Sequence, residues 1–75
     1  MINDVRELAT ARPFVPFTIH TLDGGAIHVP TVDHVHVARH VSRVFVFHDD
    51  GKYDTIRATM ISRVTVDEQA NGAHS

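Results

Sequence analysis

Seven histidines in 75 residues are the side chains with the clearest capacity for chemistry. Imidazole binds divalent metals and titrates near neutral pH, so clustered histidines predict a metal site or a response to mild acid. The alternating strand pattern of the chain places two pairs together, one across a hairpin and one along a short strand. The candidate metal ligands are His20, His28, His34 and His36. The alternative, which we favour, is that they are outward polar side chains without a ligand.

Arginine and aromatic residues in the second half of the chain are suited to nucleic acid. Guanidinium groups contact phosphates, and aromatic rings stack on unpaired bases. The candidate nucleic-acid-binding residues are Arg43, Tyr53, Arg57 and Arg63. Seven basic against nine acidic side chains give a formal net charge of −2, so we expect no duplex DNA partner and RNA binding only through a local patch. The alternative is that the arginines are solvated or paired with nearby aspartates.

Signals of catalysis are missing from the sequence. The chain has no cysteine, which excludes a thiolate nucleophile, a thiolate metal site and a disulfide. Ser42, Ser62 and Ser75 lie in no nucleophile motif, and no glycine-rich phosphate loop is present. We therefore predict a non-enzyme without a cofactor. The first residues lack a signal-peptide core and no apolar run could span a membrane, so we expect a cytoplasmic protein without membrane association.

Hydrophobic periodicity predicts the elements that position these residues. Apolar residues recur every three or four positions up to Pro13, which predicts a short N-terminal helix. From Phe17 the period becomes two, with strand patterns over 17–22, 26–29, 35–37, 44–47, 53–58 and 61–66. Because some of these patterns are short, we interpret them as a mainly β, roughly five-stranded, strongly bent antiparallel small barrel preceded by the helix. The predicted domain spans residues 1–67, and residues 68–75 are predicted to be a flexible tail.

The first hairpin has two candidate registers. A three-residue loop of Asp23, Gly24 and Gly25 pairs His20 with His28, whereas a two-residue Gly24-Gly25 loop shifts the pairing. We prefer the three-residue loop because it gathers four apolar side chains on one face. These are Phe17, Ile19, Ile27 and Val29.

Val44, Phe45, Val46 and Phe47 form a run that is apolar on both faces of its strand. A barrel this small covers one of those faces with its own core, so the run predicts an oligomer interface and a homo-oligomer. The predicted function is therefore a non-catalytic, self-assembling module with a binding or scaffolding role. Two alternatives remain open: an RNA-binding ring, and a histidine-based metal-binding or pH-responsive module.

Two resemblances accompany this interpretation. The motif Arg12-Pro13-Phe14-Val15-Pro16-Phe17, followed by Asp23-Gly24, resembles an uncharacterised family of very short bacterial proteins over residues 5 to 66 or so. That family implies no activity. The order of elements also resembles the Sm-like barrel, and Ile56-Arg57-Ala58 is similar to its second motif, with Ala58 in place of the usual glycine. No asparagine follows Asp33, where the first Sm motif would supply a base-binding one. The Sm resemblance implies a ring that binds RNA.

Overall fold

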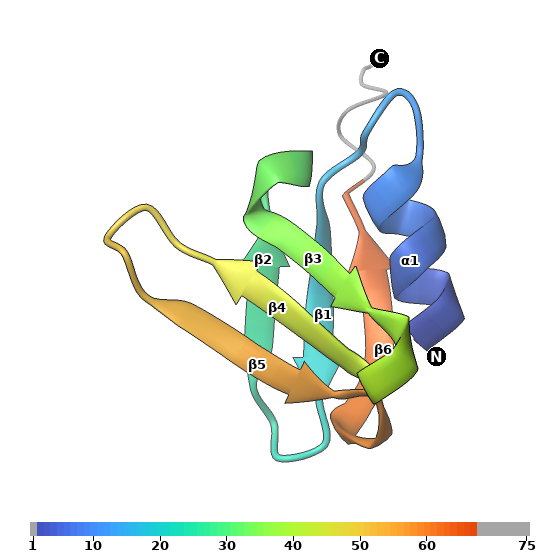
Figure 1. Ribbon diagram of the computed structural model, residues 1–75, viewed down its shortest axis with the longest axis vertical. Coiled ribbons are helices and arrows are strands. Elements are labelled where there is room, and N and C mark those ends of the chain that lie inside the picture. The colour runs from blue at the N-terminus through green and yellow to red at the C-terminus, as the bar shows by residue number, and fades with distance from the viewer. Residues whose placement is uncertain (1, 68–75) are drawn as a thin grey trace.

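The computed structural model of the chain describes residues 2–67, and the predicted tail lies outside the described residues. One N-terminal helix packs with two three-stranded antiparallel sheets, of strand order β2-β1-β6 and β3-β4-β5 (Figure 1). The elements are α1 (Ile2–Thr10), β1 (Phe17–Thr21), β2 (Ala26–Val29), β3 (Val35–Ala38), β4 (Arg43–Phe47), β5 (Tyr53–Arg57) and β6 (Ile61–Val66). Three 3₁₀ turns connect them: η1 (Val32–His34), η2 (Arg39–Val41) and η3 (Ala58–Met60).

The predicted mainly β class with an N-terminal helix is confirmed, but five strands in one barrel is wrong. The described residues form six strands in two separate sheets, without a closed barrel. The physical reason lies at Pro30, which has no amide hydrogen to continue the ladder of β2. Pairing with β1 stops at Val29, and η1 then turns the chain before β3 begins in the second sheet.

The helix α1 covers the core beside the Pro13 corner. Val5 is fully buried in the same cluster as Phe17, and Leu8 and Phe14 pack against that cluster. The rings of Phe14 and Phe17 lie 5.8 Å apart between centroids. A helix of nine residues is not stable alone in water, so this burial is what holds α1 in place. Among residues 2–67, no helix is long and apolar enough to cross a membrane.

The core lies between the two sheets and draws on both of them. The fully buried side chains are Val5 from the helix, Phe17, Ile19 and Val29 from the first sheet, and Val44 and Val46 from the second. Burial of each large apolar side chain contributes about 1.5–3 kcal/mol. The two sheets are therefore held together by the inward halves of their alternating strands.

The first hairpin confirms the predicted face but not the predicted register. Ile19 pairs with Ile27, and His20 with Ala26, so His20 is not opposite His28. The loop has three residues, as predicted, but it begins one residue earlier, at Leu22. The Thr21 amide donates to the Gly25 carbonyl at 3.0 Å and closes the loop there. The pairing shifts by two residues, so the same side chains stay inward.

A similar turn closes the β1–β2 hairpin and the β4–β5 hairpin. Gly24 and Gly51 each occupy the third loop position with a positive φ, 91° and 88°, and each donates its amide back to the residue before the loop. The preceding aspartate also accepts the amide hydrogen two residues on, from Gly25 to Asp23 and from Lys52 to Asp50. Asp-Gly is thus the turn signal in both hairpins.

Replacing Gly51 with alanine should destabilise the protein by roughly 1–2 kcal/mol, the cost of a left-handed conformation for a residue with a Cβ. A Cβ at Gly51 would meet no atom within 4 Å, so the loss is a backbone effect and not a clash. Urea unfolding followed by circular dichroism measures it. Asparagine tolerates this conformation better, so Gly51→Asn should lose less; equal losses in the two variants would contradict the explanation.

Candidate functional site

The outer face of the second sheet brings together many of the predicted site residues. Along β4, Val44 and Val46 are fully buried, whereas Phe45 is half-buried and Phe47 is exposed. Successive side chains of a strand point to opposite faces, so Arg43, Phe45 and Phe47 share the outer face. Half of the predicted oligomer interface is therefore core, and the part that remains available is Phe45 with Phe47.

Aromatic side chains gather towards the hairpin end of this face. Phe47 pairs with Tyr53 across β4 and β5, with ring centroids 6.0 Å apart, and the two residues are 42% and 61% exposed. Next to them, His36 lies 6.2 Å from Phe45, which is its partner in the β3–β4 ladder. Two large rings are thus left in water although the inward side chains of β4, Val44 and Val46, are fully buried.

Arginines occupy the opposite end of the same face. Arg43 and Arg57 are direct partners in the β4–β5 ladder, and alternation places both on the side of Phe45 and Tyr53. Arg63 is elsewhere, on β6 opposite His20 in the first sheet. Three of the four candidate nucleic-acid-binding residues therefore lie on one face, and Arg63 does not. We call this face, with His36, Arg43, Phe45, Phe47, Tyr53, Thr55 and Arg57, the outer aromatic face.

The candidate metal ligands do not come together as predicted. His28 lies opposite Thr18, and the Thr18 hydroxyl is 3.2 Å from Nδ1 of His28. Nε2 of His20 is 2.9 Å from the hydroxyl of Thr65, which lies on the neighbouring strand β6. His34 ends η1 instead of standing in a strand beside His36. Among residues 2–67, no group of three or more histidine, aspartate or glutamate side chains is placed to hold a metal ion.

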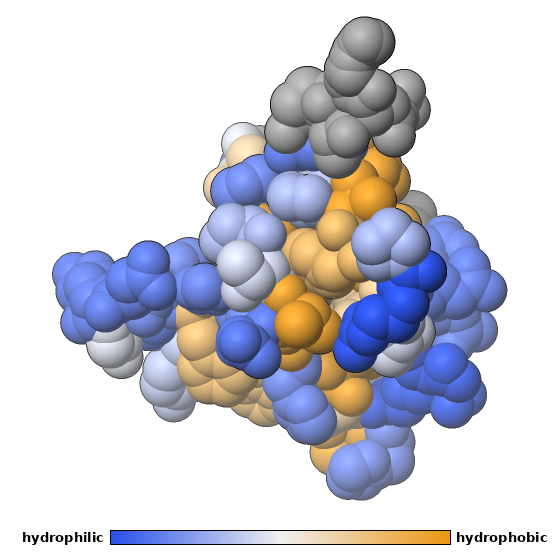
Figure 2. All heavy atoms as spheres, turned by 90° about the horizontal axis from the view of Figure 1, so that it is seen from above, coloured by the Kyte–Doolittle hydropathy of each residue, from blue (hydrophilic) through white to orange (hydrophobic). Residues whose placement is uncertain are grey.

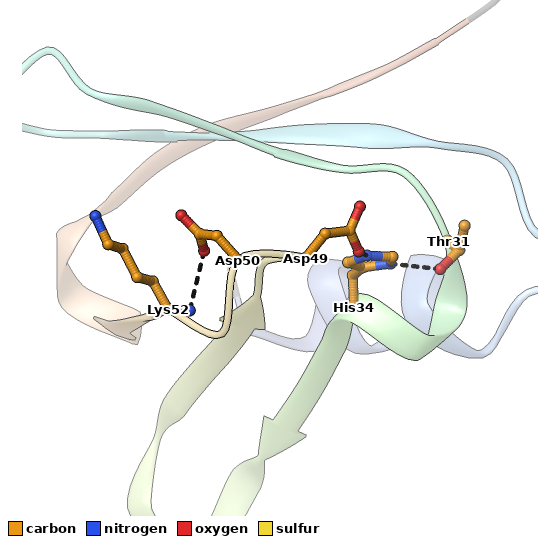
Figure 3. Close-up of polar contacts among 5 residues, drawn as sticks. All are labelled: Thr31, His34, Asp49, Asp50 and Lys52. Carbon is orange, nitrogen blue, oxygen red and sulfur yellow. Dashed lines mark hydrogen bonds and ion pairs between the residues drawn. The ribbon is translucent and has the colours of Figure 1, made fainter.

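His34 instead connects two loops that are distant in sequence (Figure 3). Its Nε2 donates to Asp49 Oδ1 at 2.9 Å, and its Nδ1 lies 2.6 Å from the Thr31 hydroxyl. With Nε2 protonated, Nδ1 of the neutral ring accepts the hydroxyl hydrogen. Asp49 is 96% exposed, so its carboxylate is well solvated and the contact is worth little energetically. We interpret these two hydrogen bonds as a connection between η1 and the β4–β5 turn.

Three further polar contacts support the β1–β2 and β4–β5 hairpins. His48 Nε2 lies 2.7 Å from Asp54 Oδ2 across the base of the β4–β5 turn. In the first hairpin, the Thr21 hydroxyl and then the Gly25 amide donate to Asp23, which lowers the pKa of that carboxyl. Each contact joins residues close to a turn, so these groups act on local structure.

The described residues line two clefts beside the sheets that the sequence alone did not reveal. One, of about 490 Å³, lies between the β1–β2 hairpin and β5, with Ile27, Ile56 and Met60 among its lining residues. The other, of about 290 Å³, lies between α1 and β3 and includes Arg6 and Arg12. Arg6 and Ala9 share one side of α1, and Arg12 follows two residues after the helix ends; this spacing is the signal that could have pointed to the second.

No protein-family model, curated protein or solved structure was found to match this chain.

Proposed function

We propose that this chain is a non-catalytic module that assembles with copies of itself through the outer aromatic face, in a binding or scaffolding role. The observation that carries the proposal is the exposure of Phe47 and Tyr53 beside half-buried Phe45, while the inward side chains of β4 are already buried in the core. Adjacent exposed aromatic rings are uncommon on a monomer and are enriched in protein interfaces.

The face is complementary to itself. Arg43 and Arg57 lie at one end, and Phe47 and Tyr53 lie at the other. A two-fold axis through the middle of the face, near Phe45, would place the guanidinium groups of each copy over the rings of the other. Arginine over an aromatic ring is a favourable cation–π arrangement, worth about 0.5–1 kcal/mol for each exposed pair. A symmetric dimer is therefore the simplest assembly that this face supports.

The free edge of β5 offers a second element of the same interface. The His48 amide donates to the Lys52 carbonyl, which fixes the alternation of the β4–β5 ladder. That alternation directs the backbone groups of Tyr53, Thr55 and Arg57 away from β4, towards an edge that no described strand covers. Pairing of this edge with a second copy would satisfy those groups and bury the adjacent rings.

At the level of architecture, we infer an open small barrel of the Sm-like kind. Two backbone hydrogen bonds in the η2 and η3 regions favour it, from Leu22 to Met60 and from Ala58 to Ser42, each 2.9 Å long. The first joins the loop after β1, which contains Leu22, to η3, which ends at Met60 and connects β5 of the second sheet to β6 of the first. Membership of the family of very short bacterial proteins and a cytoplasmic location are parts of the same proposal.

Single-stranded RNA is the second candidate ligand of the outer aromatic face. The specific observation is the meeting of Arg43, Arg57 and Tyr53 on one sheet surface, since exposed rings stack on bases and neighbouring guanidinium groups contact phosphates. A labelled oligouridine tests this candidate by fluorescence anisotropy. If RNA is a ligand, the oligouridine should bind saturably and in a salt-sensitive way, and Arg57→Gln should weaken that binding. If the face serves self-assembly alone, the oligouridine should not bind.

Replacing Phe47 with lysine should reduce the particle mass to that of one subunit and leave the subunit folded. The change puts a charge among the rings at the proposed interface, and Phe47 is 42% exposed, so the core is not disturbed. Light scattering after gel filtration gives the mass, and circular dichroism reports the fold.

The matched control is Leu22→Lys, in the first hairpin. Leu22 is an apolar side chain with 63% exposure that lies outside the outer aromatic face, so its replacement should leave the mass unchanged. If both variants keep the wild-type mass, or both lose it, the interface is not on this face.

A further inference from the structure

A groove between α1 and β3 combines positive charge with an apolar floor. Figure 2 looks onto the end of the molecule where η1 lies and shows apolar residues exposed at its centre, with hydrophilic ones around them. The groove encloses about 290 Å³. Its apolar lining is Ala9, Val32, Val35 and Val37, and its polar lining is Arg6, Thr10, Arg12 and His36.

The two arginines at the groove have no acidic partner among residues 2–67. The ion pairs found there join His34 to Asp49 and His48 to Asp54, and neither involves Arg6 or Arg12. One Arg12 nitrogen, Nη1, donates to the Ala11 carbonyl at 2.8 Å, and the other guanidinium donors have no side-chain or backbone acceptor within the described residues. Two exposed guanidinium groups beside one groove are complementary to carboxylates.

The wall of the groove opposite α1 is a strand edge. In the β3–β4 ladder, alternation directs the backbone of His36 towards β4 and that of Val35 and Val37 away from it, on the side of α1. The Val35 amide already donates to the Val32 carbonyl. In the part of the chain that the structure describes, the Val37 amide and carbonyl remain as the edge groups to which an extended chain could pair.

We propose that this groove binds an extended acidic segment of a partner protein. The segment adds to the edge of β3 at Val37, places alternate apolar side chains on the floor formed by Ala9 and Val35, and pairs its carboxylates with Arg6 and Arg12. Charge selects the occupant, because two cations without an acidic partner in the described part of the chain favour an acidic ligand over a basic one. The apolar floor and the strand edge favour a peptide over a small inorganic anion.

A fluorescent peptide of alternating valine and glutamate, titrated with the full chain, tests this proposal by anisotropy. Binding is expected, and Arg6→Gln combined with Arg12→Gln should weaken it about tenfold or more, the effect of removing two charge-assisted contacts. The matched control is Arg63→Gln, an exposed arginine on β6 in the first sheet, which should not change binding. A valine–lysine peptide should not bind.

Amide chemical shifts locate the peptide and separate the other occupants. Shifts centred on Val35–Val37 and on α1 support the proposal. The proposal is overturned if the valine–glutamate peptide does not bind, or if Arg63→Gln weakens its binding as much as the double arginine variant does. It is also overturned if octanoate or oligouridine binds at the same residues more tightly than the peptide. Concentration-dependent shifts at these residues in the free protein would assign the groove to a second copy and overturn it as well. Phe47→Lys should keep the peptide affinity, so this test is independent of the assembly proposed for the outer aromatic face.

Discussion

Replacing Ile19 with aspartate should leave the chain unfolded at room temperature. Ile19 is fully buried at the centre of β1, with Ile27 on one side and Val64 on the other. The change removes about 1.5–3 kcal/mol of apolar burial and places a carboxylate in a core to which the described residues contribute no buried polar side chain, at a further cost of several kcal/mol. A single core of this size supplies only about 3–5 kcal/mol of net stability. Circular dichroism and amide-proton dispersion measure the loss of fold.

The adjacent residue provides the control for that experiment. His20 points to the outer face of the first sheet, where its ring contacts the Thr65 hydroxyl. His20→Asn should therefore cost no more than about 0.5–1.5 kcal/mol, the net contribution of one hydrogen bond. A folded Ile19→Asp protein, or an unfolded His20→Asn protein, would show that the inward and outward sides of β1 have been assigned the wrong way round.

Deleting residues 1–12 should produce an aggregating or unfolded chain. The deletion removes Val5, which is fully buried, and also Leu8 and Ala9, so it uncovers Phe17 and the apolar side of β3. Because Val5 lies in the core cluster, the helix is part of the fold and not an appendage. Solubility and thermal unfolding of the truncated chain measure the effect.

A point variant within α1 separates the loss of burial from the loss of chain length. Val5→Asp should be as damaging as the deletion, whereas Glu7→Ala on the exposed side of the same helix should be close to neutral. A truncated chain that stays soluble and unfolds cooperatively would contradict the role given to α1.

The alternation of the first hairpin predicted its inward face, but it could not predict its register. Registers that differ by two residues keep Phe17 and Ile19 inward, so the hydrophobic pattern does not distinguish between them. The choice was made by the turn, where Gly24 takes the positive φ and Asp23 accepts the Gly25 amide. Because the register was wrong, the predicted pairing of His20 with His28 was also wrong.

The candidate sites depended on tertiary pairings that the sequence does not contain. The run from Val44 to Phe47 is apolar at every position, so burial of its alternate members was decided by the core it meets. Arg63 was separated from Arg57 because β6 pairs with β1 and not with β5. Aromatic and basic content predicted the types of residue on the outer aromatic face, but not which of them would share it.

The mass of the wild-type protein in solution is the most direct test of the proposed self-assembly. Light scattering coupled to gel filtration, at concentrations up to the high micromolar range, should give twice the 8.3 kDa subunit mass or a larger whole multiple of it. A constant mass of 8.3 kDa over that whole range would contradict the account, because the outer aromatic face would then remain open to water in the native protein.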